Sequence, residues 1–203
     1  MGSFWMKFSI LIAVVFMIDN ATAVSNLKWV KASNGKVPAY AVAGGEDFPG
    51  EVLYVARIQL SSGLTPGKMD QSSNMAHASW GGKEKYSSHY EILTNPGWKS
   101  HLEWKKSGGS NPPANAVVGG SDGGKPVYVA RFLNSDGHMI PGKASYIQRL
   151  AHIGYGGKEY IARRWWVLVE HTNSGRKRGI SSRFEYPVLQ GVEPLQRAPI
   201  RVQ

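Results

Sequence analysis

A long segment of this 203-residue chain occurs twice, at an offset of 75 residues. Its opening, Pro38–Asp47, returns as Pro113–Asp122, and further matches follow in the same order. At the same offset, Pro66–Lys68 matches Pro141–Lys143 and Gly81–Glu84 matches Gly156–Glu159. Before them, Tyr54–Arg57 matches Tyr128–Arg131 at an offset of 74, a slip that is compensated further along the chain. A tandem repeat of this length predicts one structural unit that is used twice.

Apolar residues alternate along Glu51–Leu60 and along its counterpart Pro126–Leu133, which predicts two largely buried strands. Further strands are predicted at Asn26–Val30, Asn74–Trp80, Tyr86–Leu93, His101–Lys105, Leu150–Tyr155 and Tyr160–Glu170. Turns rich in Gly, Pro, Asn and Asp separate them, and no window has a helical apolar stripe between caps. We therefore expect an all-β protein of two tandem, pseudo-symmetric repeat domains of antiparallel strands.

The predicted organisation has four parts. A basic start, an apolar run over Phe8–Ile18 and the small-residue site Ala21–Ala23 predict a signal peptide at 1–23, and hence a secreted, extracellular protein. The first repeat spans 24–100, the second spans 101–170, and a basic, proline-containing tail spans 171–203. Because each repeat is small, we expect the halves to share an interface or exchange strands.

Charge and cysteine usage limit the function classes. The chain has no cysteine, which excludes disulfides and thiolate metal sites. Its formal net charge is +10, so it will be drawn towards anionic surfaces.

Two aspartates and two lysines are the candidate binding residues. Asp47 and Asp122 each follow a Gly-Gly pair, and Lys68 and Lys143 are predicted to close Pro-Gly-Lys turns. A carboxylate and an ammonium in one pocket suit neighbouring sugar hydroxyls, which both donate and accept hydrogen bonds. From spacing alone, each aspartate is more typical of a turn former and each lysine of a solvated turn residue.

Other motifs give little support for catalysis or cofactors. Gly81–Glu84 and Gly156–Glu159 lack the phosphate-loop pattern and predict hairpin turns with an exposed charged pair. His77 and His152 are interpreted as buried, satisfied imidazoles. Histidines with zinc-ligand spacing are missing from the sequence. Gly119–Gly123 fits the letters Gly-x-Ser-x-Gly but leads into a predicted strand, not into the helix that follows a nucleophile elbow. We expect no metal, no cofactor and no enzymatic activity.

The repeated motifs resemble the tandem DM-nine repeat of invertebrate proteins over about 26–170. They are also similar to the mannose-specific lectins of bivalves and to the front module of natterin-like proteins. The resemblance implies that Asp47 acts with Lys68, and Asp122 with Lys143, in metal-independent mannose binding. The chain departs from those lectins at Leu64, where they can present an acidic side chain.

These observations predict a secreted lectin-like protein with two sites for mannose-type glycans, plausible in innate pattern recognition. A homodimer would multiply the sites and increase avidity for a microbial surface. One alternative is a basic adhesive for anionic surfaces or glycans without a specific sugar site. Another is a structural or effector protein that has lost its sites. Nucleic acid is not an expected partner, because no nucleic-acid motif is present.

Overall fold

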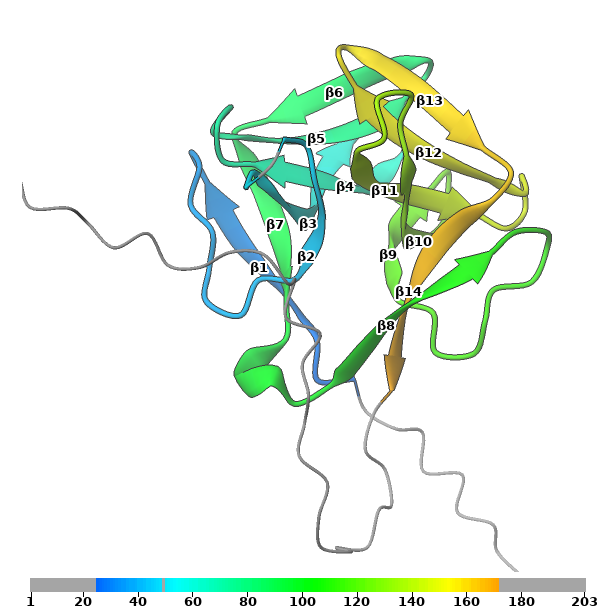
Figure 1. Cartoon of the computed structure of the whole chain (residues 1–203), viewed down its shortest axis with the longest axis horizontal. Coiled ribbons are helices and arrows are strands. Elements are labelled where there is room, and N and C mark those ends of the chain that lie inside the picture. The colour runs from blue at the N-terminus through cyan, green and yellow to red at the C-terminus, as the bar shows by residue number, and fades with distance from the viewer. Residues whose placement is uncertain (1–24, 49, 172–203) are drawn as a thin grey trace, which may run out of the picture.

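A computed structural model describes residues 25–48 and 50–171, and most of them lie in β-strands (Figure 1). The strands are β1 (Lys28–Ser33), β2 (Ala43–Glu46), β3 (Val52–Leu60), β4 (Gly63–Asp70), β5 (Met75–Trp80), β6 (Lys83–Ser87), β7 (His89–Thr94), β8 (His101–Ser107), β9 (Val118–Asp122), β10 (Lys125–Leu133), β11 (Met139–Ser145), β12 (Leu150–Tyr155), β13 (Lys158–Ala162) and β14 (Trp165–His171). A short 3-10 turn, η1 (Pro96–Trp98), joins β7 to β8. The predicted all-β class is confirmed.

Two predicted segments lie outside the described residues. These are the signal peptide at 1–23 and the tail beyond His171. Within the described part of the chain, no helix has the length and apolar character needed to cross a membrane.

The sheet has a pseudo-twofold order. Its strands run β1-β7-β3-β4-β5-β6 through the first half and then β13-β12-β11-β10-β14-β8 through the second, so the second half repeats the first in reverse. The halves join where Lys83 of β6 pairs with Lys158 of β13, two residues that are equivalent in the repeats. The two repeats therefore share one sheet, and β6 and β13 lie next to each other where the halves meet (Figure 1).

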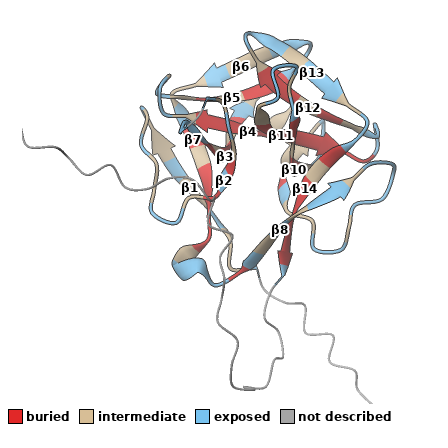
Figure 2. Cartoon of the chain, viewed as in Figure 1, coloured by how far each residue is buried: buried red, intermediate tan, exposed pale blue. Residues whose placement is uncertain are grey.

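The central strands are apolar on both faces because they lie between separate clusters of the core. In β3, Ala56 and Ile58 pack in the cluster of the first half. Val55, on the opposite face, packs with Val129 and Leu168 of the second half. Figure 2 shows buried residues concentrated in these inner strands, with exposed residues at the outer hairpins. Both alternating segments predicted as buried strands are thereby confirmed.

The Pro-Gly-Lys motifs are strands, and the prediction that they form turns is wrong. Pro66 and Lys68 lie within β4, and the equivalent residues lie within β11. The ladder between β4 and β5 begins only at Gly67, so Pro66 stands where the strand is paired on one side. That is a position at which a strand tolerates proline.

The Gly-Gly motif of each half packs on the Pro-Gly strand of the other half. A Cβ atom on Gly45 would lie 1.8 Å from the Met139 carbonyl oxygen, and one on Gly120 would lie 2.0 Å from that of Leu64. The preceding glycines, Gly44 and Gly119, contact the rings of Pro141 and Pro66. Only glycine permits so close a backbone approach. The repeated Gly-Gly and Pro-Gly motifs are thus the two sides of one contact.

An arginine from each half completes this contact. Arg57 Nη1 donates to the Gly119 carbonyl at 3.1 Å, and Arg131 Nη1 donates to the Gly44 carbonyl at 3.0 Å. Each guanidinium stacks on a tryptophan of its own half, Trp29 or Trp104, at 4.3 and 4.2 Å from the ring centroid. The Tyr-Val-Ala-Arg motif therefore also serves the junction between the halves.

Two predicted strands are each divided in the structure. Tyr86–Leu93 is interrupted at Ser88 between β6 and β7, and Tyr160–Glu170 is interrupted at 163–164 between β13 and β14. In both places the chain leaves one neighbour and pairs with another: β6 pairs with β5, whereas β7 pairs with β1 and β3. Short polar runs mark both bends, Ser87–His89 and Arg163–Arg164, but the predicted strands extended through them because apolar residues resume on the far side.

Candidate functional site

Lys68 and Lys143 lie in the middle of β4 and β11, close to the junction between the halves. Their side chains are only 6% and 4% exposed. A buried ammonium group is costly unless it is paired and hydrogen-bonded. The partners of these two lysines therefore define the candidate sites.

In the first site, Lys68 is held by groups from both halves. Its Nζ donates to Glu84 Oε1 at 2.7 Å and to the Gly154 carbonyl at 2.5 Å. It also lies 5.4 Å from the centroid of the Tyr155 ring. Burial alone would raise the pKa of Glu84, but the hydrogen bonds with His77, Lys68 and the Gly157 N–H outweigh it and lower the pKa to about 2.

Asp47 does not pair directly with Lys68 as predicted. Its Oδ1 accepts a hydrogen bond from the Tyr155 hydroxyl at 2.8 Å. This bond and burial raise the pKa of Tyr155 to about 12. Tyr155 thus contacts Lys68 through its ring and Asp47 through its hydroxyl, and it links the two predicted site residues.

In the second site, the predicted pair is brought together. Lys143 Nζ donates to Asp122 Oδ2 at 2.9 Å. The lysine side chain is buried, whereas the aspartate side chain is 30% exposed. Burial would raise the pKa of Asp122, but the hydrogen bond and charge of Lys143, together with Ser62, lower it. The carboxylate remains ionised at neutral pH and is accessible to a ligand.

A small hollow of about 140 Å³ opens beside Asp122. Its lining residues are Asp122, Lys125, Val127, Ser145, Ile147 and Gln148. The Asp122 carboxylate and the Lys125 ammonium therefore meet there beside hydroxyl, amide and apolar side chains, while the Lys143 ammonium does not line the hollow.

Sequence reasoning missed two glutamates that support these sites. Glu84 Oε2 accepts from the Gly157 N–H at 2.8 Å, and Glu159 Oε2 accepts from the Gly82 N–H at 2.7 Å. Each glutamate therefore holds the hairpin turn of the opposite half. The turns were predicted correctly, but their glutamates are only 8% and 11% exposed and do not form exposed charged pairs.

Each of these glutamates also contacts the histidine of its own half. His152 Nδ1 lies 3.0 Å from Glu159 Oε1, and His77 Nδ1 lies 3.3 Å from Glu84 Oε1. The signal that could have identified this arrangement was the recurrence of both residue types at the common offset of 75. Across residues 25–48 and 50–171, no cluster of three or more His, Asp or Glu side chains is arranged to hold a metal ion.

Comparison with known proteins agrees with the repeat. The family model of the DM9 repeat matches residues 7–85 and again 49–162. Natterin-4 of Thalassophryne nattereri is 31% identical over 144 residues, which cover 71% of this chain and 34% of natterin-4. The chain thus spans about a third of that relative's length.

A solved structure has the same fold. The crystal structure of the nematode sperm cell motility protein MFP2B aligns with a TM-score of 0.53 and 21% identity, over 74% of this chain and 48% of that one. Taken at the level of the family, the DM9 match and the natterin relative suggest a lectin-like role. The tandem motifs, the shared sheet and the matched residues together show that the chain belongs to the DM9 repeat family.

Proposed function

We propose that this protein is a secreted, non-enzymatic, lectin-like protein that binds mannose-type glycans without a metal ion. The sites are Asp47 with Lys68 and Asp122 with Lys143. The observation that carries the proposal is the second pair, in which a buried ammonium holds a partly exposed carboxylate at 2.9 Å.

The chemistry of this pair suits a sugar diol. Lys143 supplies donors only, and ionised Asp122 supplies acceptors only. Of two adjacent sugar hydroxyls, one accepts from the ammonium and the other donates to the carboxylate. Because the lysine is buried and already oriented, little side-chain entropy remains to be lost on binding.

The two sites are expected to differ in strength. Lys68 already donates to Glu84 and Gly154, and Asp47 accepts from Tyr155. A ligand at the first site must compete with these bonds, whereas a ligand at the second site meets a single ion pair. Two unequal sites on one chain still provide avidity for a glycan-covered microbial surface, consistent with pattern recognition.

Calorimetric titration with mannose and mannan in about 150 mM salt tests the proposal. The wild-type chain should bind both ligands, and the Asp47→Ala/Asp122→Ala variant should bind neither while retaining its fold. Asp122→Ala alone should remove most of the affinity. Glu103→Ala, an exposed carboxylate on β8, is the control for loss of one negative charge.

A wild-type chain that binds no neutral sugar would contradict the lectin proposal. In that case the net charge of +10 favours the second candidate, an adhesive for anionic surfaces or glycans. Its binding should fall steeply with salt and survive both aspartate substitutions.

A further inference from the structure

In each half, three side chains lie in register across three neighbouring strands, and this row differs in charge between the halves. In the first half, Glu91 of β7 lies between two cations, because it pairs in register with Arg57 of β3 and with Lys31 of β1. Arg57 Nη2 and Glu91 Oε2 are 2.6 Å apart. The carboxylate therefore neutralises the half-buried guanidinium beside it.

In the second half, Trp166 takes the place of that glutamate. It pairs in register with Arg131 of β10 and with Lys106 of β8. Arg131 donates to the Gly44 carbonyl and stacks on Trp104, but no carboxylate among the described residues pairs with it and its buried Nε has no partner there. Burial lowers the pKa of Arg131 to about 10, which still leaves it charged at neutral pH. The second row thus has two cations and no internal counter-ion.

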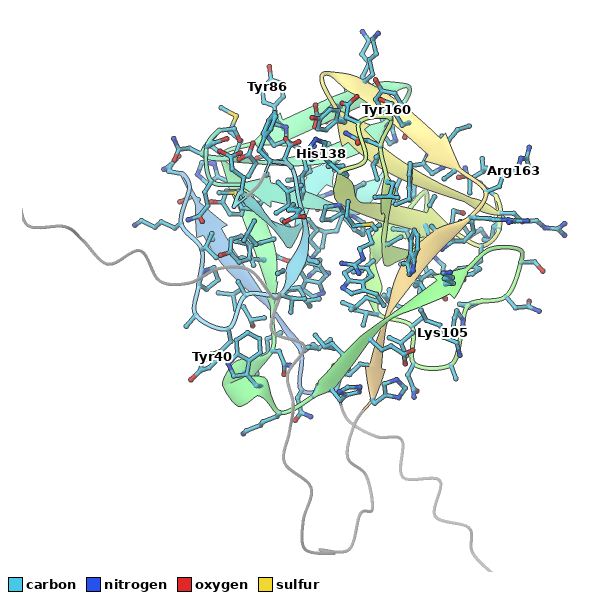
Figure 3. All side chains as sticks on the ribbon, viewed as in Figure 1. Tyr40, Tyr86, Lys105, His138, Tyr160 and Arg163 are labelled. Atoms are coloured by element: carbon cyan, nitrogen blue, oxygen red, sulfur yellow. The ribbon has the colours of Figure 1, made fainter. Side chains whose placement is uncertain are left out.

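A hollow of about 420 Å³ adjoins this row, a volume within the usual range of ligand pockets. It is lined by Lys106, Ser107, Phe132, Leu133, Ala162, Arg164, Trp165 and Trp166. Two of these side chains are cationic, none is acidic, and aromatic rings form much of the wall. The two cationic residues are Lys106 and Arg164. Lys105 and Arg163, which adjoin them in the chain, lie on the same side of the molecule in Figure 3.

We propose that this hollow binds the carboxylate or sulfate group of an acidic saccharide. Lys106 and Arg164 supply charged donors at its surface, and Arg131 adds positive potential behind Trp166. The indole of Trp166 offers an apolar face to the sugar ring, so the ligand is more than a bare anion. The site lies on β8 and β14, away from the Lys143–Asp122 pair on β11 and β9, and does not depend on the proposed mannose sites.

The test uses the whole chain and two charged probes, a short heparin oligosaccharide and an oligogalacturonide, with neutral mannan as a third ligand. The decisive variants are Lys106→Gln and Lys31→Gln, which remove the same charge from equivalent exposed positions of the two halves. Lys106→Gln should weaken binding of the acidic probes by about tenfold, as expected for loss of a charge-assisted contact, and Lys31→Gln should leave it within about twofold. A carboxylate ligand is indicated if both probes bind, and a sulfate ligand if only heparin does.

A second variant restores the arrangement of the first half. Trp166→Glu places a carboxylate between Arg131 and Lys106 and should reduce binding of the acidic probes by at least about tenfold. Equal losses in Lys106→Gln and Lys31→Gln would show a general charge effect and overturn the proposal. So would unchanged binding in Lys106→Gln, or binding to anionic phospholipid vesicles but to neither saccharide. If Trp166→Glu fails to fold, the matched lysine pair still decides.

Discussion

Lys68 and Lys143 occupy equivalent positions in the two halves, yet their ion pairs differ. Lys143 bonds Asp122, the aspartate that follows the Gly-Gly pair of its own repeat, whereas Lys68 bonds Glu84 and a carbonyl of the other half. The difference accompanies one aromatic exchange. Tyr155 donates a hydroxyl to Asp47, while its counterpart Trp80 has no hydroxyl to offer. The two halves thus differ both in this ring and in the partner of the equivalent lysine, although the strands around them are the same.

The junction between the halves shows no such divergence. Both Gly-Gly motifs approach a backbone carbonyl of the opposite strand, and both arginines donate to a glycine carbonyl. Close backbone packing permits few substitutions, whereas a partly exposed site tolerates new partners. The comparison separates the residues that maintain the fold from those of the candidate sites.

The largest effect is expected at the junction. Gly45→Ala and Gly120→Ala should each lower the free energy of unfolding by more than about 3 kcal/mol, because the new methyl group collides with backbone that cannot move away. Urea unfolding of both variants measures this loss. Gly81→Ala, in open space at a φ of +62°, controls for backbone strain and should cost only about 1 kcal/mol. If only one junction variant is destabilised, the halves are not equivalent there.

An intermediate effect is expected from the acid dependence of Glu84. Its pKa is lowered in the folded protein from 4.5 to about 2, so the unfolded chain binds more protons between these values. The stabilisation, about 3 kcal/mol, is therefore fully present above about pH 4.5 and is lost as the pH falls towards 2. Glu84→Gln should flatten the stability curve over this range. Urea titrations at several pH values measure the slope, and the exposed Glu103→Gln should leave it unchanged.

The smallest effect concerns Tyr155 itself. Tyr155→Phe removes the hydroxyl that occupies Asp47 and should raise the affinity of the first site for mannose about two- to threefold. Calorimetry in an Asp122→Ala background isolates that site. Tyr160→Phe, at an exposed tyrosine on β13, is the control. An affinity that falls would show that the tyrosine hydroxyl contacts the sugar and does not compete with it.

Local patterns in the sequence were enough to predict the strands with apolar alternation. The segments around Val55 and Val129 were identified because burial on both faces is visible in their own residues. Pro66-Gly67-Lys68 was misinterpreted because proline and glycine usually indicate a turn. In the structure Pro66 packs against Gly119 of the other half, and no local pattern contains that contact.

The candidate sites were predicted only in part, because some of their contacts join the two halves. Asp122 and Lys143 belong to one repeat, and the family resemblance paired them. The partner of Asp47 is Tyr155, 108 residues away in the sequence, and only the shared sheet brings them together. Residue types and the repeat offset can suggest which side chains matter, but the pairing across the halves has to come from the structure.

The pseudo-twofold order also shows what the covalent connection between the halves, through η1, contributes. Each half presents the same surface to the other, so Gly44 contacts Pro141 just as Gly119 contacts Pro66. Such reciprocity is the geometry of an isologous dimer interface, here within one polypeptide. The covalent link therefore supplies effective concentration, and the complementarity of the surfaces supplies the geometry. In this sense the molecule resembles a dimer whose two subunits are joined in one chain, and whose candidate sites make different contacts.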